Sequence, residues 1–181
     1  MCMTWAFLRR IMAKLFPDAW EESTFHIDYQ KLYELGYRGL IFDIDNTLVF
    51  DCAPADERAI RFLDEIRKMG FEVCLLSNNN ERRVKMFNEE IGARFIFHAG
   101  KPKPDGYLKA MEMMGTTREN TVFIGDQVFT DVWGAKNAGV KVIMVKRLGP
   151  KEEKHILVKR VLEQPVMLAF RLSGGRKKKF Y

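Results

Sequence analysis

The stretch Gly39-Leu40-Ile41-Phe42-Asp43-Ile44-Asp45-Asn46-Thr47-Leu48 decides the fold, because it joins a short apolar run to two closely spaced carboxylates. Residues 39–42 predict a buried strand. The polar residues that follow would lie on the loop at the carboxyl end of that strand, where open α/β sheets place their ligands. Asp43 and Asp45 on one loop can divide a covalent phosphoryl or acyl transfer between a nucleophile and a proton carrier. Capping of a turn is the alternative, since Asp and Asn favour turns.

The length and composition of the chain fit one globular α/β domain. Its 181 residues are 47% hydrophobic and 30% charged, which allows a substantial core and leaves no room for a second full domain. The three cysteines form no disulfide or zinc pattern, so we expect a reducing compartment. No stretch approaches the roughly 18 uninterrupted apolar residues of a membrane-spanning helix.

The net charge of +6 is concentrated at the two ends of the chain. Residues 1–16 carry three basic residues and no acid, and residues 166–181 carry five basic residues and no acid. Basic ends on a near-neutral body favour an anionic partner, either a lipid surface or nucleic acid. The apolar and basic residues of 1–17 are compatible with an interfacial helix, a helix docked on the domain, or a transit peptide.

Strand and helix patterns alternate after the first strand. Apolar runs predict strands at 71–76, 93–98, 121–124 and 140–145, and helical spacing predicts intervening helices at 55–69, 81–91 and 105–114 and one that ends at 138. This order is typical of a parallel sheet with right-handed crossovers. We therefore expect an α/β, Rossmann-like fold of three layers, α/β/α, around a central and mainly parallel sheet. A last helix is expected at 151–163, ended by Gln164-Pro165, and residues 166–172 would either pair with the sheet or lie on a membrane.

Polar side chains follow four of the predicted strands. They are Asp43 and Asp45, Ser77 with Asn78, Lys101, and Asp126 with Asp131. The carboxyl ends of parallel strands share one edge of the sheet, so these residues can converge on one crevice. Ser77 can donate to a phosphate and Lys101 can compensate its charge. Asp43 and Asp126 offer the oxygen ligands that Mg²⁺ prefers.

Four segments in this order resemble the motifs of the haloacid dehalogenase superfamily, over about residues 38–146. They are Asp43-Ile44-Asp45-Asn46-Thr47, Ser77-Asn78-Asn79-Asn80, Lys101-Pro102 and Gly125-Asp126 through Asp131. The resemblance implies a phosphoaspartyl mechanism, in which Asp43 attacks phosphorus while Asp45 protonates the leaving oxygen and later activates water. The presence of Asp45 favours phosphate transfer over dehalogenation.

The same resemblance implies the ligands of phosphate and metal. Ser77, Asn78 and Lys101 would hold the phosphoryl oxygens, with Lys103 in a second Lys-Pro pair as the reserve for the lysine. Mg²⁺ would be held by the side chains of Asp43 and Asp126 and the main-chain carbonyl of Asp45, with Asp131 supporting these ligands.

The spacing of the motifs leaves no room for a cap domain. The gaps from Asp45 to Ser77 and from Ser77 to Lys101 each fit a helix and a strand and nothing larger. Members of the superfamily that bind small metabolites usually insert a cap at one of these two places. An uncapped site favours a substrate whose own body closes it, such as a phosphate on a macromolecule or a lipid headgroup.

Within the superfamily, the chain is similar to the subfamily IIIA branch called YqeG-like, which includes mitochondrial phosphatidylglycerophosphate phosphatases. The similarity lies in residues 43–49 and 77–84, in Gly125-Asp126-Gln127 with Thr130-Asp131, and in Leu15-Phe16-Pro17. The branch implies removal of the terminal phosphate of phosphatidylglycerophosphate at a membrane surface, and the basic ends of this chain suit an anionic bilayer.

These observations predict an amphipathic segment at 1–17, a phosphatase domain at 18–165 and a basic tail at 166–181. The expected location is the cytoplasm, peripheral on the inner face of the cell membrane, or the mitochondrion if residues 1–17 are a transit segment. One alternative is a soluble phosphatase of the same fold that acts on a sugar, nucleotide or protein phosphate. A second is a non-enzymatic protein that binds RNA or protein, although the tail lacks the interleaved aromatic residues that favour nucleic acid. Glu81-Arg82-Arg83 would either clamp a second anionic group or begin a solvated helix. No oligomeric state is predicted.

Overall fold

The structure is a computed structural model that describes residues 12–149, 154–175 and 179–181. Six parallel strands form one sheet in the order β1-β6-β5-β2-β3-β4. The strands are β1 (Ala19–Glu21), β2 (Gly39–Phe42), β3 (Glu72–Leu76), β4 (Arg94–Ile96), β5 (Thr121–Gly125) and β6 (Lys141–Val145). The α-helices are α2 (Tyr29–Glu34), α3 (Glu57–Lys68), α4 (Glu81–Asn88), α5 (Asp105–Met114), α6 (Trp133–Ala138) and α7 (Lys154–Leu172). Two short turns complete the order, the 3₁₀ turn η1 (Thr24–His26) and the π-helical turn η2 (Val128–Val132).

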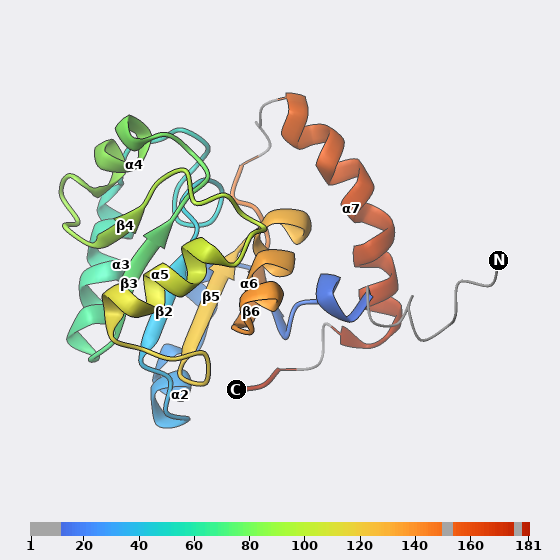
Figure 1. Cartoon of the computed structure of the whole chain (residues 1–181), viewed down its shortest axis with the longest axis horizontal. Coiled ribbons are helices and arrows are strands. Elements are labelled where there is room, and N and C mark those ends of the chain that lie inside the picture. The colour runs from blue at the N-terminus through green and yellow to red at the C-terminus, as the bar shows by residue number, and fades with distance from the viewer. Residues whose placement is uncertain (1–11, 150–153, 176–178) are drawn as a thin grey trace.

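Helices cover both faces of the sheet (Figure 1). Because successive strand residues point to opposite faces, Leu40 and Phe42 of β2 join the core that contains residues of α2, α3 and α4. Ile41, between them, joins the core that contains residues of α5, α6 and α7. The predicted three-layer α/β/α fold with a parallel sheet is therefore confirmed.

The segments between the strands carry single helices. The structure describes all of residues 39–121, and within them only α3 lies between β2 and β3 and only α4 between β3 and β4. No cap domain is inserted at either place within this range. Over this range the carboxyl edge of the sheet consequently carries no inserted cap.

Two elements at the amino-terminal side were not predicted. β1 is a three-residue strand that pairs with β6 at the edge of the sheet, and it is too short to show an alternating pattern. α2 had a recognisable signal, because Asp28 precedes it and its side chain accepts a hydrogen bond from the N–H of Lys31 at 2.9 Å. An aspartate in this position is a common helix cap.

The prediction that a helix ends at Gln164-Pro165 was wrong. α7 runs from Lys154 to Leu172 with Pro165 inside it. A proline in a helix interior costs about 3 kcal/mol of stability. However, Val166 and Phe170, which follow the proline in the same helix, are both buried. Burial of one such side chain is worth roughly 1.5–3 kcal/mol, so two of them offset the proline. The expected boundary between residues 165 and 166 falls within this helix, and residues 166–172 do not pair with the sheet.

The described parts of both chain ends pack on the domain. Residues 1–11 of the expected amphipathic segment lie outside the described residues, but residues 12–15 are helical and the Phe16 ring meets the Phe170 ring edge-on, with centroids 5.4 Å apart. At the other end, Lys179 Nζ lies 2.5 Å from Glu21 Oε1 of β1, and the Tyr181 hydroxyl donates to the same carboxylate. In the part of the chain that the structure describes, no helix is both long enough and apolar enough to cross a bilayer.

Candidate active site

Four of the residues predicted to converge lie together at one edge of the sheet. Asp43 follows β2 and Asp126 follows its neighbour β5, while Lys101 reaches the same place from the loop between β4 and α5. Lys101 Nζ lies 2.5 Å from Asp43 Oδ1 and 2.8 Å from Asp131 Oδ1. Carboxylate oxygens of Asp43, Asp126 and Asp131 all lie within 4.8 Å of one another. The sheet therefore assembles three acids and one lysine from distant parts of the sequence.

Lys101, and not Lys103, is the lysine in this cluster. Lys101 is 7% exposed, whereas Lys103 is exposed to solvent. Burial alone would lower the pKa of Lys101, but Asp131 and Asp43 outweigh it and raise the pKa, so the side chain carries a positive charge. A buried cation at this place can neutralise the oxygens of a bound phosphate.

Two carboxylates of the cluster, Asp43 and Asp126, are hard to ionise without a further cation. Burial raises the pKa of Asp43 to about 7, Lys101 opposes the increase, and Asp131 adds to it. Burial also raises the pKa of Asp126 well above its usual value, with Arg160 opposing. The Thr47 hydroxyl lies 3.4 Å from an oxygen of each of these two acids. Positive charge placed between Asp43 and Asp126 would stabilise both as carboxylates.

The donor set of the cluster fits Mg²⁺, because it consists of carboxylate oxygens, which hard divalent cations prefer. The oxygens of Asp131 already accept hydrogen bonds: Oδ1 from Lys101, and Oδ2 from the N–H groups of Asp126 at 3.1 Å and Gln127 at 3.0 Å. Asp43 and Asp126 each keep one oxygen whose hydrogen bond, from the Thr47 hydroxyl, is 3.4 Å long, so they are the two side chains best placed to bind the ion. Asp131 instead orients Lys101 and the loop that carries Asp126.

Ser77 and Asn78 follow β3, next to β2, as predicted. Ser77 is buried, and its Oγ accepts a hydrogen bond from the N–H of Asn79 at 3.1 Å. The side chain of Asn78 is committed to the backbone of Lys101, accepting from its N–H at 2.8 Å and donating to its carbonyl at 3.0 Å. A phosphate contact from Asn78 would thus come from its backbone N–H, while its side chain fixes the position of Lys101.

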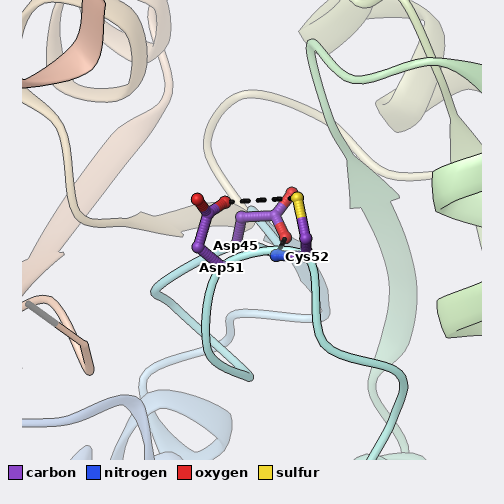
Figure 2. Close-up of side chains that lie close together, drawn as sticks. All are labelled: Asp45, Asp51 and Cys52. Atoms are coloured by element: carbon purple, nitrogen blue, oxygen red, sulfur yellow. Dashed lines mark hydrogen bonds between the residues drawn. The ribbon is translucent and has the colours of Figure 1, made fainter. Parts of the chain in front are cut away.

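Asp45 lies at the rim of the site, and its two oxygens have different surroundings. Oδ1 accepts hydrogen bonds from Arg83 Nε at 3.1 Å, Arg83 Nη2 at 2.6 Å and the N–H of Cys52 at 2.9 Å. Figure 2 shows one oxygen of the Asp45 carboxylate next to the backbone nitrogen of Cys52. Oδ2 accepts one longer hydrogen bond, from Asn79 Nδ2 at 3.4 Å. Oδ2 is consequently the oxygen better able to exchange a proton with a substrate.

Arg83 is buried, so the reading of this residue as part of a solvated helix start is wrong. Its side chain is 6% exposed, and among the described residues its Nη1 is a buried nitrogen without a hydrogen-bond partner. A buried guanidinium with an unmade hydrogen bond is costly. Asn80 helps to place it, because the Asn80 side chain caps α4 by accepting from the N–H of Arg83 at 2.9 Å. The ion pair with Asp45 offsets part of the free-energy cost of burying Arg83.

Two residues of α7 also reach the site, and sequence reasoning missed both. Arg160 Nη1 donates to the backbone carbonyl of Asp126 at 2.7 Å, and Arg160 Nη2 forms an ion pair with the Asp126 carboxylate. Glu163 Oε1 accepts from the N–H groups of Val128 at 2.7 Å and Phe129 at 3.3 Å, at the start of η2. The available signal was a pair of opposite charges three residues apart on one helix. That signal gives no indication that the pair faces a loop rather than solvent.

Comparison with known proteins agrees with the geometry. A family model described as haloacid dehalogenase-like hydrolase matches residues 50–139, a range that includes Ser77, Lys101, Asp126 and Asp131 but not Asp43 or Asp45. The chain is 37% identical over 166 residues to a probable phosphatase, YqeG, of Bacillus subtilis, and the match covers 91% of this chain and 96% of that protein. It is 29% identical over 143 residues to phosphatidylglycerophosphate phosphatase 1, chloroplastic/mitochondrial, of Arabidopsis thaliana, covering 73% of this chain and 41% of that protein.

Solved structures show the same fold at lower identity. NagD from the E. coli K-12 strain matches with a TM-score of 0.50 and 16% identity, over 60% of this chain and 87% of that chain. Another solved structure, a crystal structure, matches with a TM-score of 0.54 and 17% identity, over 76% of this chain and 85% of that chain. At such identities the likeness concerns the arrangement of strands and helices.

Proposed function

The chain belongs to the haloacid dehalogenase-like hydrolases, within the YqeG-like phosphatases, and from this membership we propose that it hydrolyses phosphomonoesters through an aspartyl-phosphate intermediate with the help of Mg²⁺. The observation that carries the proposal is the pairing of Asp43 with Lys101 at 2.5 Å, at the carboxyl edge of a parallel sheet, with Asp45 two residues along the chain. This arrangement supplies a nucleophile, a cation for the phosphoryl group and a proton carrier within one site.

In the proposed first step, a carboxylate oxygen of Asp43 attacks phosphorus and forms an acyl phosphate. Lys101 and Ser77 hold the phosphoryl oxygens, so charge on the phosphoryl group is balanced while the bond to the leaving oxygen breaks. Mg²⁺, held by Asp43, Asp126 and the main-chain carbonyl of Asp45, would supply the positive charge that lets an anionic nucleophile approach an anionic phosphate. Asp131 keeps Lys101 in place throughout.

Asp45 would move the protons in both steps. Its Oδ2 gives a proton to the leaving alkoxide as the phosphorus–oxygen bond breaks, which releases the alcohol. The resulting carboxylate then takes a proton from a water molecule that attacks the phosphorus of the acyl phosphate. The phosphorus–oxygen bond to Asp43 breaks, inorganic phosphate leaves, and both aspartates return to their starting forms. Arg83 and Cys52 hold the other oxygen of Asp45 and so keep Oδ2 directed to this task.

The proposed substrate is phosphatidylglycerophosphate, which would give phosphatidylglycerol and inorganic phosphate. Three observations support a lipid: the similarity to a relative named as a phosphatidylglycerophosphate phosphatase, the lack of a cap within residues 39–121, and the basic residues at both ends of the chain. The proposed location is accordingly peripheral, on the inner face of a membrane.

A substrate panel tests both levels of the proposal. The full-length protein is incubated with phosphatidylglycerophosphate in vesicles and, separately, with soluble aryl, sugar and nucleotide phosphates, with Mg²⁺ or with EDTA. We expect release of phosphate to need Mg²⁺ for every substrate and to be far faster for the vesicles. Equal rates on lipid and soluble substrates would contradict the proposed lipid substrate. Activity that survives EDTA would contradict the proposed requirement for Mg²⁺.

A further inference from the structure

Helix α7 is apolar on two opposite faces. Its inner face contributes Val166 and Phe170 to the packing against the domain, where they are 9% and 3% exposed. Its outer face, defined here as Val161, Leu162, Leu168 and Leu172, is between 57% and 81% exposed. Single exposed apolar side chains are ordinary, but several that gather on one element mark an interaction surface. The outer face of α7 therefore lacks the partner that its composition calls for, at least among the described residues.

The charges on α7 indicate what that partner is. The sequence of the helix contains Lys154, His155, Lys159, Arg160 and Arg171, and its one acidic residue is Glu163. Glu163 is only 4% exposed, because it faces η2, whereas Arg171 is exposed. Exposed leucines beside an exposed arginine, with no exposed acid among the side chains of α7 that the structure describes, fit the surface of an anionic bilayer. A second copy of the same basic helix would instead be repelled.

The position of α7 ties its outer face to the site. Figure 1 shows α7 as the outermost helix on the β6 side of the sheet. Arg160 and Glu163 hold the loop of Asp126 and η2 from the inner side of the same helix. Since a helix with its side chains is about 10–12 Å across, a bilayer on the outer face would lie about that far from this loop.

We propose that the outer face of α7 docks the protein on an anionic bilayer by inserting Val161, Leu162, Leu168 and Leu172 among the lipid headgroups. The inference rests on the proposed lipid substrate and adds the surface by which the protein reaches it. Docking in this orientation holds the catalytic edge of the sheet beside the headgroup layer, where a lipid phosphate is presented at high local concentration.

A charge-insertion variant tests the docking face. Leu162→Asp, Leu168→Asp and Leu172→Asp are combined in the full-length chain, with Leu35→Asp plus Leu108→Asp as control, because Leu35 at the end of α2 and Leu108 on α5 are also exposed, at 49% and 37%. Binding is measured by co-sedimentation with equimolar phosphatidylcholine and phosphatidylglycerol vesicles and with phosphatidylcholine vesicles alone. We expect the α7 variant to bind the anionic vesicles roughly a hundredfold less than wild type. The control variant should bind as wild type does, and all three proteins should hydrolyse a soluble aryl phosphate at the same rate.

Three other outcomes have definite meanings. Unchanged vesicle binding by the α7 variant overturns the inference, and so does a shift from dimer to monomer in solution without a change in vesicle binding, because a second copy would then cover the face. A milder variant with Gln at the same three positions gives the same comparison if the Asp variant fails to fold. Wild type could bind anionic vesicles through α7 and yet release no phosphate from phosphatidylglycerophosphate in them. That result would support the docking face and contradict the proposed substrate.

Discussion

The floor and the rim of the site are built in opposite ways. The floor, made of Asp43, Lys101, Asp126 and Asp131, is 7% exposed or less, and its charges face one another across the strand ends. The rim, made of Asp45, Arg83 and Cys52, is assembled from a loop and a helix, and the Asp45 side chain is 18% exposed. The floor depends on electrostatic balance in a poorly hydrated place, whereas the rim depends on the orientation of one carboxylate. Damage to the floor should therefore stop the reaction, and damage to the rim should slow it selectively.

Asp43→Asn is the change with the largest expected effect. The amide cannot form the acyl phosphate, so turnover of an aryl phosphate should fall by at least about 10⁴-fold. The measurement is initial phosphate release with Mg²⁺, together with trapping of the phosphorylated protein, which should label wild type and not the variant. Because Asn is nearly isosteric, the variant should unfold cooperatively like wild type in urea. Substantial turnover by the Asp43→Asn protein would contradict the covalent scheme and the distinction between floor and rim.

Lys101→Met should have the next largest effect, because it removes the cation that faces both Asp43 and Asp131. We expect kcat to fall by roughly 10²–10³-fold, as is typical when one charge-stabilising donor is removed from a transition state. Lys103→Met is the matched control, since Lys103 lies two residues away in a second Lys-Pro pair and is exposed. Its kcat should stay within about twofold of wild type. Equal losses in the two variants would mean that the register of this loop in solution differs from the one described.

Arg83→Gln should produce a smaller loss that depends on the leaving group. With Arg83 gone, Asp45 keeps its carboxyl group but loses two of the hydrogen bonds to Oδ1, so proton delivery to the leaving oxygen becomes less efficient. Hydrolysis of an alkyl phosphate, whose alkoxide needs the proton, should slow about 10–100-fold, while a nitrophenyl phosphate should slow little. Arg82→Gln is the control, because Arg82 is exposed on the same turn of α4. A uniform loss of activity on both substrates would assign Arg83 a purely structural role. It would also contradict the proposal that Arg83 orients Asp45 for proton transfer.

The sequence predicted the floor better than the rim for a physical reason. Asp43, Lys101 and Asp126 directly follow apolar strands or the loop after one, and a parallel sheet brings such positions to one edge whatever the packing above it. Arg83 lies on a helix, where burial depends on the neighbouring loop that folds over it. The Asn78 side chain is a similar case, because its partner is the backbone of Lys101 and backbone partners have no sequence signature.

The end of α7 was mispredicted because local and tertiary preferences disagree there. Pro165 favours a helix end on local grounds, and the burial of Val166 and Phe170 overrides it through contacts with residues far away in the chain. The same long-range packing brings Arg160 to Asp126. Neither could be derived from periodicity, since apolar residues occur on both faces of the helix.

Arg160→Gln should have the smallest effect. This variant tests whether α7 merely packs beside the floor or helps to form its metal site. Arg160 and Mg²⁺ would both compensate the Asp126 carboxylate, so removing the guanidinium should tighten Mg²⁺ binding, by less than about tenfold because the ion pair has Glu163 as an internal competitor. Calorimetric titration with Mg²⁺ measures this without substrate, and Arg171→Gln, on the exposed side of the same helix, should leave the affinity unchanged. Weaker Mg²⁺ binding in the Arg160→Gln protein would show instead that Arg160 holds the Asp126 loop in its metal-binding position through the backbone carbonyl. In that case α7 would be part of the floor, and movement of the helix at a membrane would change metal affinity as well as access to the substrate.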